Sequence, residues 1–379
     1  MRFPEFEGEW VEYSNHELFN IISEKNKLSE GYTVLSASQT EGMISRDHIG
    51  VNIKYEKESL RGYKIVKKGD YIIHLRSFQG GFAFSELHGI CSPAYTILRP
   101  NNLLEYSFLK RYFTSLKFIN SLKLVTYGIR DGKSISVEEW FKLKTSMPKK
   151  DEQSKIVKFL SLIDERIETQ NKIIEKLESL IRGIYSSTKR ESWVMLYLRD
   201  VLEERNEQNS HGYPIFSVAV REGIINQIEH LGRSFAAKDT RNYNVVQLGD
   251  IVYTKSPTGD FPYGIVKQSF INQPVAVSPL YGVYKPKNYH LGNILHHYFL
   301  SPINANNYLY SLIQKGAKNT INITTQRFLD KAILLPTQEI EIKNISLLLE
   351  TVNKKIYMEK NVLIKLETQK RFLLQQMFI

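Results

Sequence analysis

Two segments of the chain, residues 149–190 and 337–379, repeat apolar residues at alternating steps of four and three. Gly183 is the only glycine or proline inside either run, and a proline precedes each one, at Pro148 and Pro336. This heptad spacing predicts a long helix in each segment, with a seam along which two helices pack. The seam residues are Ile156, Leu160, Ile163, Ile167, Gln170, Ile174, Leu177, Ile181 and Ile184, and Ile345, Leu349, Val352, Ile356, Glu359, Leu363, Leu366, Lys370, Leu373 and Met377.

One polar residue interrupts each seam near its middle, Gln170 in the first helix and Glu359 in the second. If the helices pair antiparallel, the two middles meet, and these side chains can form a hydrogen bond that fixes the register. The alternative is two exposed polar residues on a loose seam. We expect the paired arrangement.

A thinner apolar stripe lies beside the seam. A two-stranded coiled coil does not need it. It either packs against the globular parts of the chain or is a docking surface for another subunit. Its members are Phe159, Leu162, Ile173, Leu180, Leu348 and Val362.

The other two segments, residues 1–148 and 191–336, are dense in β-branched and aromatic residues. Short runs such as YKIVKKGDYIIHL (63–75) and NVVQLGDIVYTK (244–255) predict strands around Gly-Asp turns. Helical stretches, such as residues 105–122, lie among the strands. Each segment is therefore expected to be a globular domain of mixed α/β composition.

The chain is an internal tandem repeat. YTVLSASQTEGMI (32–44) matches YPIFSVAVREGII (213–225), and the two Gly-Asp runs match at nearly the same offset, which predicts a duplicated unit of about 185 residues. The expected fold class is α+β, with two globular domains held apart by two long antiparallel coiled-coil helices in pseudo two-fold symmetry.

Charge points to a polyanionic partner. The chain has 51 Lys and Arg against 40 Asp and Glu, a net charge of +11, which favours nucleic acid. Cys91 is the single cysteine, so an internal disulfide is excluded and a cytoplasmic location is expected. No apolar run approaches the length of a membrane span.

The stretch YGIRDGKSIS (127–136) ends like a phosphate-binding loop, but Gly128 is too close to Gly132 and the second unit keeps no Gly-Lys-Ser. We reject nucleotide binding. Both units keep a glycine followed two residues later by a base, which suits a nucleic-acid phosphate. The alternative is a solvated turn before a helix capped by Ser136. The predicted contacts are Gly128, Arg130, Lys133, Lys315, Lys318 and Asn319.

The loops that follow the Gly-Asp turns carry a basic residue beside small polar ones, the residue types that recognise guanine by paired hydrogen bonds. Any of these residues can equally be an ordinary surface charge. The candidates for DNA binding are Arg76, Ser77, Gln79, Lys255, Ser256 and Thr258, with Arg46, Lys54, Arg61, Arg221, Arg233, Lys238 and Arg241 elsewhere in the domains.

The sequence contains none of the catalytic patterns that we sought: a metal-binding Cys/His cluster, His-Glu-x-x-His, Gly-x-Ser-x-Gly, or the Pro-Pro motif of DNA amino-methyltransferases. We therefore assign no catalytic residue and no metal. A nuclease or methyltransferase with unrecognised chemistry is one alternative, and a coiled-coil scaffold that binds DNA without sequence preference is another.

The layout resembles the specificity subunit of type I restriction–modification systems. The resemblance covers the whole chain and is carried by RFPEFEGEW (2–10), by Pro148 followed by KKDEQSKIVKFLSLIDERIETQNKIIEKLE, and by KLETQKRFLLQQMF (365–378). The second unit departs from the pattern, because TQEIEIKNI (337–345) replaces the usual Glu-Gln-lysine run.

The resemblance implies a non-catalytic subunit with two target-recognition domains, residues 1–148 and 191–336, and two spacer helices, residues 149–190 and 337–379. Each domain would recognise one half of an asymmetric, interrupted target in double-stranded DNA. The helices would recruit two methyltransferase (modification) subunits and, through them, restriction subunits. S-adenosylmethionine, ATP and magnesium ions would belong to those partners, and this chain would hold no cofactor.

Overall fold

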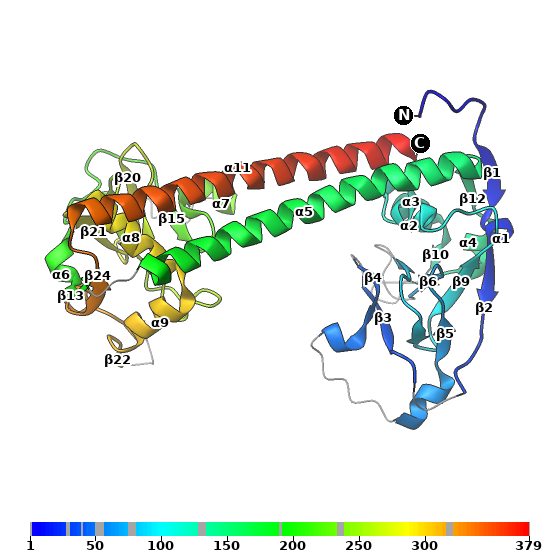
Figure 1. Ribbon diagram of the computed structural model, residues 1–379, viewed down its shortest axis with the longest axis horizontal. Coiled ribbons are helices and arrows are strands. Elements are labelled where there is room, and N and C mark those ends of the chain that lie inside the picture. The colour runs from blue at the N-terminus through cyan, green and yellow to red at the C-terminus, as the bar shows by residue number, and fades with distance from the viewer. Residues whose placement is uncertain are drawn as a thin grey trace. The chain divides into compact units, whose positions relative to one another are not determined.

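The chain forms two compact units in a computed structural model (Figure 1). Unit 1 comprises Met1–Gln170 and Val362–Ile379, and unit 2 comprises Asn171–Asn361. Each unit therefore contains one recognition segment and part of both long helices. The structure describes residues 2–27, 31–38, 41–49, 57–74, 81–127, 134–188, 192–232, 239–315 and 321–378.

The two long helices predicted from the heptads are present and unbroken: α5 spans Lys150–Thr188 and α11 spans Glu339–Met377 (Figure 1). Acidic residues occupy the first turn of each helix, where they favour the positive end of the helix dipole. Among the described helices, none combines the length and apolar character needed to cross a membrane. The seam residues that are buried are Ile156, Leu160, Gln170, Ile174, Ile181, Ile184, Ile345, Leu349, Val352, Ile356, Leu366, Leu373 and Met377.

Within each unit, the segments of α5 and α11 run antiparallel. In unit 1, Lys370 Nζ lies 2.7 Å from Asp164 Oδ1, and Ile156 near the start of α5 shares a core with Met377 at the end of α11. In unit 2, Lys360 Nζ lies 2.8 Å from Glu178 Oε1, while the last turns of α5 share a core with the first turns of α11.

Unit 1 is built on a four-stranded antiparallel sheet in the order β2-β9-β6-β7. Three two-stranded ribbons, β3-β4, β5-β8 and β10-β11, accompany it, and the ribbon β1-β12 joins the two ends of the recognition segment. The strands are β1 (Val11–Ser14), β2 (Phe19–Ile22), β3 (Leu35–Ser38), β4 (Gly42–Ser45), β5 (Lys64–Val66), β6 (Tyr71–Ile73), β7 (Phe82–Phe84), β8 (Gly89–Cys91), β9 (Thr96–Pro100), β10 (Thr126–Tyr127), β11 (Ser134–Ile135) and β12 (Lys144–Met147). The short helices are α1 (Asn15–Leu18), η1 (Arg46–Ile49), η2 (Lys57–Gly62), α2 (Phe108–Tyr112), α3 (Leu116–Leu122), η3 (Lys123–Val125) and α4 (Val137–Lys142).

Unit 2 repeats this topology strand for strand. Its sheet has the order β14-β21-β18-β19, and its ribbons are β13-β24, β15-β16, β17-β20 and β22-β23. The duplication predicted from the sequence is therefore a duplication of topology. The strands are β13 (Val194–Tyr197), β14 (Leu202–Glu204), β15 (Phe216–Ala219), β16 (Gly223–Asn226), β17 (Asn244–Val246), β18 (Ile251–Tyr253), β19 (Val266–Gln268), β20 (Val275–Val277), β21 (Gly282–Pro286), β22 (Gln314–Lys315), β23 (Ile321–Asn322) and β24 (Ala332–Leu335). The helices are α6 (Leu198–Val201), α7 (Gln227–Leu231), α8 (Tyr289–Leu300), α9 (Pro302–Tyr310) and α10 (Thr325–Leu329).

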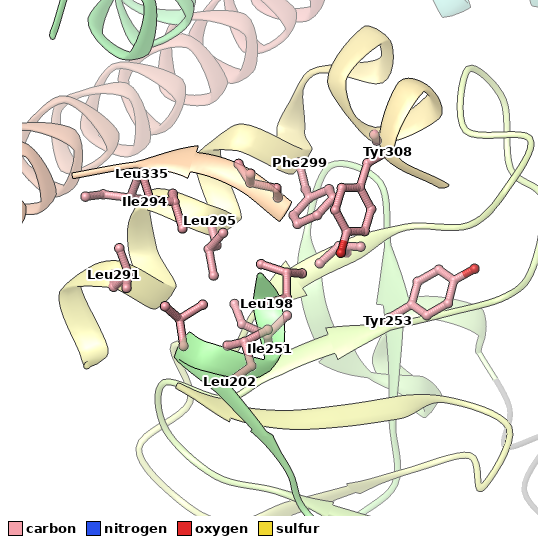
Figure 2. Close-up of a cluster of buried hydrophobic side chains, with 14 of the residues drawn as sticks. Leu198, Leu202, Ile251, Tyr253, Leu291, Ile294, Leu295, Phe299, Tyr308 and Leu335 are labelled. Atoms are coloured by element: carbon pink, nitrogen blue, oxygen red, sulfur yellow. The ribbon is translucent and has the colours of Figure 1, made fainter. Parts of the chain in front are cut away.

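Each unit has a core that joins its recognition segment to the long helices. In unit 1 the centre of this core is aromatic, with Trp140 of α4 packed against Phe82 and Phe19 at ring distances of 5.1 and 5.7 Å. In unit 2, Leu291, Ile294 and Leu295 of α8 pack in one cluster with residues of the sheet, as Figure 2 shows. Burial of such side chains contributes about 1.5–3 kcal/mol each.

The structure corrects one detail of the sequence interpretation and adds the pairing of the strands, which the sequence left open. The helical stretch 105–122 is two helices, α2 and α3, because Ser115 caps a new helix by accepting a hydrogen bond from the N–H of Phe118. The strands on either side of each Gly-Asp turn do not pair with each other: β5 pairs with β8, whereas β6 pairs with β7 and β9.

Candidate nucleic-acid interface

Many predicted DNA contacts fall outside the described residues, and they stay predictions. Lys315 lies in β22, but its side chain is also outside what the structure describes. The others are Lys54, Arg76, Ser77, Gln79, Gly128, Arg130, Lys133, Arg233, Lys238, Lys318 and Asn319.

The Gly-Asp turn of unit 1 is an anchor for the predicted recognition loop that follows β6. Asp70 is buried, and its Oδ2 atom accepts a hydrogen bond of 2.8 Å from the N–H of Lys67, which closes the turn. Arg99 of β9 donates two more hydrogen bonds to the carboxylate, both 2.8 Å long. This bidentate pair fixes the start of β6 to the neighbouring strand.

Unit 2 has the same turn with a different arginine. Asp250 is 1% exposed and accepts from the N–H of Gln247 at 2.8 Å. Arg205, which follows β14, donates from Nε at 2.6 Å and from Nη2 at 3.0 Å. Burial raises the pKa of the Asp250 carboxyl, although Arg205 and the Gln247 N–H act in the opposite direction. The sequence predicted the turn but not this role of its aspartate, for which the available signal was the presence of an aspartate in both repeats.

The loop that follows β18 is described, and backbone hydrogen bonds and a buried ring fasten it to the core beneath it. Thr258 and Phe261 exchange two backbone hydrogen bonds of 3.1 and 2.9 Å, and the buried Phe261 ring anchors the turn. Asn306 of α9 donates to the carbonyl of Asp260 at 3.1 Å. A side chain on Gly264 would overlap the carbonyl oxygen of Thr254, so only glycine closes this loop.

The predicted contacts on this loop differ in exposure. Lys255 is half-buried, whereas Ser256 and Thr258 are exposed. The loop therefore carries two exposed hydroxyl residues and one half-buried lysine on a backbone that hydrogen bonds hold in place. A fixed arrangement suits recognition of base edges, because little conformational entropy is lost when DNA binds.

The glycine-containing segments for which phosphate contact was predicted lie outside the described residues, and a pair of antiparallel strands flanks each one. Strands β10 and β11 flank residues 128–133 in unit 1, and β22 and β23 flank residues 316–320 in unit 2. Each strand pair leads into a capped helix, since Ser136 accepts from the N–H of Glu139 and Thr324 accepts from the N–H of Arg327. The predicted cap at Ser136 is confirmed, and phosphate binding by the turns stays a prediction.

Four predicted arginines have described side chains. Arg46 is half-buried, and its Nε atom donates to Ser36 Oγ at 2.8 Å, so it ties η1 to β3. Arg61 and Arg221 are exposed at the end of η2 and in the β15–β16 turn. Arg241 is also exposed and forms an ion pair of 2.6 Å with Asp239. The last three are therefore accessible to a polyanion, and their contacts with DNA stay predictions.

Two predictions about the long helices, the Gln170–Glu359 pair and the apolar stripe, can be compared with the structure. Glu359 forms an ion pair of 2.5 Å with Lys355, one turn earlier on α11. Gln170 and Glu359 belong to different units, so their hydrogen bond stays a prediction. Phe159 packs against the core of unit 1 with its ring 5.7 Å from that of Phe3, whereas the rest of the apolar stripe is exposed by 38–55%.

Comparison with known proteins identifies the fold. Residues 7–179 match the family model described as the type I restriction modification DNA specificity domain. A sequence search of curated proteins finds no match. Among solved structures, the type I restriction–modification S subunit from M. genitalium aligns over 100% of this chain and 99% of its own, with a TM-score of 0.60 and 13% identity.

A second structure, which concerns complex assembly and conformational transition of the type I R-M system, aligns over 99% of this chain and 98% of its own, with a TM-score of 0.56 and 14% identity. Both alignments extend through the two units and both long helices. The resemblance seen in the sequence is confirmed: residues 7–179 belong to the DNA specificity domain family of type I restriction–modification systems, and the chain as a whole has the fold of their specificity subunits.

Proposed function

We propose that this chain is the sequence-specific DNA-recognition subunit of a type I restriction–modification complex, and that each unit recognises one half of an asymmetric, bipartite target. The observation that carries the proposal is the repeated topology with different loops on it. The loop after β18 is a turn closed by Thr258 and Phe261, whereas the corresponding loop after β6 has the unrelated sequence FQGG (78–81). Two copies of one scaffold with different loops suit two different half-sites.

In this proposal the two recognition domains are held apart by the antiparallel helices in pseudo two-fold symmetry, which sets the distance between the half-sites. Each long helix has 39 residues and is therefore about 58 Å long. Successive major-groove faces on one side of DNA recur about every 34 Å. The helices therefore have the length needed to space two major-groove contacts.

The exposed apolar stripe supports the recruitment of methyltransferase subunits. In unit 2, Ile173, Leu180 and Leu348 are exposed by 39, 49 and 46%. Exposed apolar side chains at a regular helical spacing favour burial against a partner. S-adenosylmethionine, ATP and magnesium ions would then be bound by the methyltransferase and restriction subunits in the cytoplasm, and this chain would be non-catalytic.

The test is to express the chain with a methyltransferase subunit of a type I system and to sequence the methylated DNA. We expect one bipartite motif. Replacing residues 1–148 by another recognition domain should change one half of the motif and leave the other half intact. Cleavage or methylation by the purified chain with magnesium ions or S-adenosylmethionine would favour an enzyme instead, and equal binding to all sequences would favour a non-specific scaffold.

The docking surface has its own test. Leu180→Asp and Leu348→Asp place a charge on the stripe without disturbing the seam, so co-purification with the methyltransferase should be lost while DNA binding persists. Asn171→Asp is the matched control, because it adds the same charge at an exposed position of α5 away from the stripe. Unchanged co-purification of both leucine variants would rule out this surface.

A further inference from the structure

Each unit exposes a large apolar side chain just before the strand pair that flanks its predicted phosphate contacts. Leu124 of η3 is 73% exposed and precedes β10, and Tyr310 at the end of α9 is 67% exposed and precedes β22. Each of them follows a core side chain by two residues, Leu122 in unit 1 and Tyr308 in unit 2. The two residues therefore occupy the same place in the duplicated topology, although their types differ.

The packing around Leu124 keeps this side chain turned toward solvent. Leu122 and Val125 on either side of it are 0 and 3% exposed and belong to the core of unit 1. In the preceding helix α3, the ring of Phe118 lies 4.9 Å from that of Phe82, the first residue of β7. Helix α3 therefore packs at the end of the sheet where the predicted recognition loop after β6 returns to β7, and Leu124 directly follows this helix.

Tyr310 is held beside the recognition loop of unit 2. Its ring lies 5.7 Å from that of Tyr263, which belongs to the loop after β18. Lys331 closes the end of α9, because its Nζ atom donates to the carbonyls of Asn307 and Tyr308 at 2.7 and 2.8 Å. Tyr308 itself belongs to the buried cluster shown in Figure 2. A fixed helix end therefore carries the exposed Tyr310 ring next to the loop.

The charge of the surrounding sequence indicates what covers these apolar side chains. Residues 106–130 and 261–329 contain no aspartate or glutamate, although the whole chain has 40 acidic residues. Both stretches carry lysines and arginines instead, and Lys117 and Lys123 are exposed close to Leu124 in the sequence. Charge complementarity therefore favours DNA as the partner of this surface.

We propose that Leu124 and Tyr310 are wedge residues, each of which inserts between two neighbouring base pairs of the half-site that its unit recognises. This inference rests on the proposed DNA-binding function. Proteins that deform DNA insert apolar side chains at a base step, and an aromatic ring replaces part of the lost stacking. Such a contact reads no pattern of hydrogen bonds, so it can be kept in both units while the recognition loops change. An opened step also lowers the cost of extruding a base for modification.

The experiment places 2-aminopurine, in turn, at each adenine of a duplex that carries the motif found by methylation sequencing. The emission of this base rises when its neighbours unstack, and it is recorded as the full-length chain binds without a methyltransferase, so that base flipping by an enzyme does not contribute. We expect a bright position in each half-site with the wild type. Leu124→Ala should abolish the one in the half-site of unit 1, and Tyr310→Ala the other. Leu124→Met and Tyr310→Phe, which keep a large side chain, should restore them.

The binding affinity gives a second measurement. Each alanine variant should weaken binding on the order of tenfold, as loss of one stacking contact does. The slope of log K against log salt should stay unchanged, because no charge is removed. Leu87→Ala and Leu248→Ala are the matched controls, since both leucines are exposed in turns at the opposite end of the sheet from the recognition loops. Neither control should alter the emission or the affinity.

Three results overturn the wedge. The first is a wild type that binds its motif without a bright position, and the second is unchanged emission in both alanine variants. The third is full DNA affinity of the alanine variants together with loss of co-purification with a methyltransferase, which would make this surface a protein docking site. Failure of the wild type to prefer its motif over a scrambled duplex would instead contradict the proposed function.

Discussion

The buried ion pair of unit 2 gives a sharp test of how the Gly-Asp turn holds the recognition segment together. In Arg205→Ala the Asp250 carboxylate, which is 1% exposed, loses both guanidinium hydrogen bonds and keeps only the N–H of Gln247. Removing one partner of a buried pair leaves an uncompensated charge and costs about 3–5 kcal/mol. We expect a loss of this size in the unfolding free energy of unit 2 at pH 7.

The loss should depend on pH in a defined direction. The pKa of Asp250 is already raised by burial, and removing Arg205 raises it further. A carboxyl with a folded-state pKa above its unfolded value takes up its proton more readily in the folded state, so the folded state gains stability as pH falls through that pKa. The difference between Arg205→Ala and the wild type should therefore narrow from pH 7 to pH 5.

Native-state hydrogen exchange provides the measurement, because it reports on the opening of individual strands. Amides of β18 should exchange faster in Arg205→Ala, and those of β6 in unit 1 serve as the internal reference. Arg241→Ala is the control, since the exposed pair with Asp239 contributes nothing measurable to stability although its loss should weaken DNA binding. Equal exchange of β18 in the two variants would refute the anchoring role of Asp250.

Two other outcomes follow from the described contacts. The Nδ1–H of His297 donates to the carbonyl oxygen of Asn293, and its Nε2 atom accepts from the side-chain amide of Asn353. Burial lowers the pKa of His297 to about 4, so the unfolded chain binds a proton from pH 6.5 downward that the folded chain refuses until about pH 4. His297 alone should therefore contribute about 3 kcal/mol to the destabilisation of unit 2 between pH 7 and pH 4, and His297→Gln should remove this part of the pH dependence in urea unfolding. Ser136→Ala should lower the stability of unit 1 by about 1 kcal/mol in the same assay, and Ser136→Asn, which keeps a cap, should restore it; an unaffected alanine variant would mean that the cap at α4 contributes nothing.

The sequence predicted well those parts of the fold that depend on a regular spacing of residues along the chain. A seam residue such as Leu349 is buried because steps of four and three keep one face of a helix toward the core of its unit. The prediction needs no knowledge of what surrounds the helix. The duplication was visible for a similar reason, since each copy keeps the order and spacing of its strands.

Contacts between distant residues could not be obtained in this way. Asp70 meets Arg99 only because β6 and β9 are neighbours in the sheet, and the sequence does not fix that order. Arg46 looked like a free basic residue, yet it is tied to Ser36 across a ribbon. Lys267 appeared to be one charge among 51, yet it is buried because helix α8 and strand β16 pack against β19.

The two units use different hydrogen-bond donors to hold the corresponding carboxylates. This limits how far the contacts of one unit can be predicted from those of the other. Both keep the acidic residue of the Gly-Asp turn, but its arginine comes from β9 in unit 1 and from the end of β14 in unit 2. Both keep a glutamate in the first turn of a long helix: Glu152 accepts from Arg2 at 2.8 Å, and Glu341 accepts from Trp193 at 3.1 Å. The acceptors stayed fixed after duplication while the donors were replaced. Because even buried ion pairs have different donors in the two units, exposed loops are expected to differ more. The DNA contacts of one unit therefore cannot be inferred by transferring residues from the other, and the two half-sites are expected to differ.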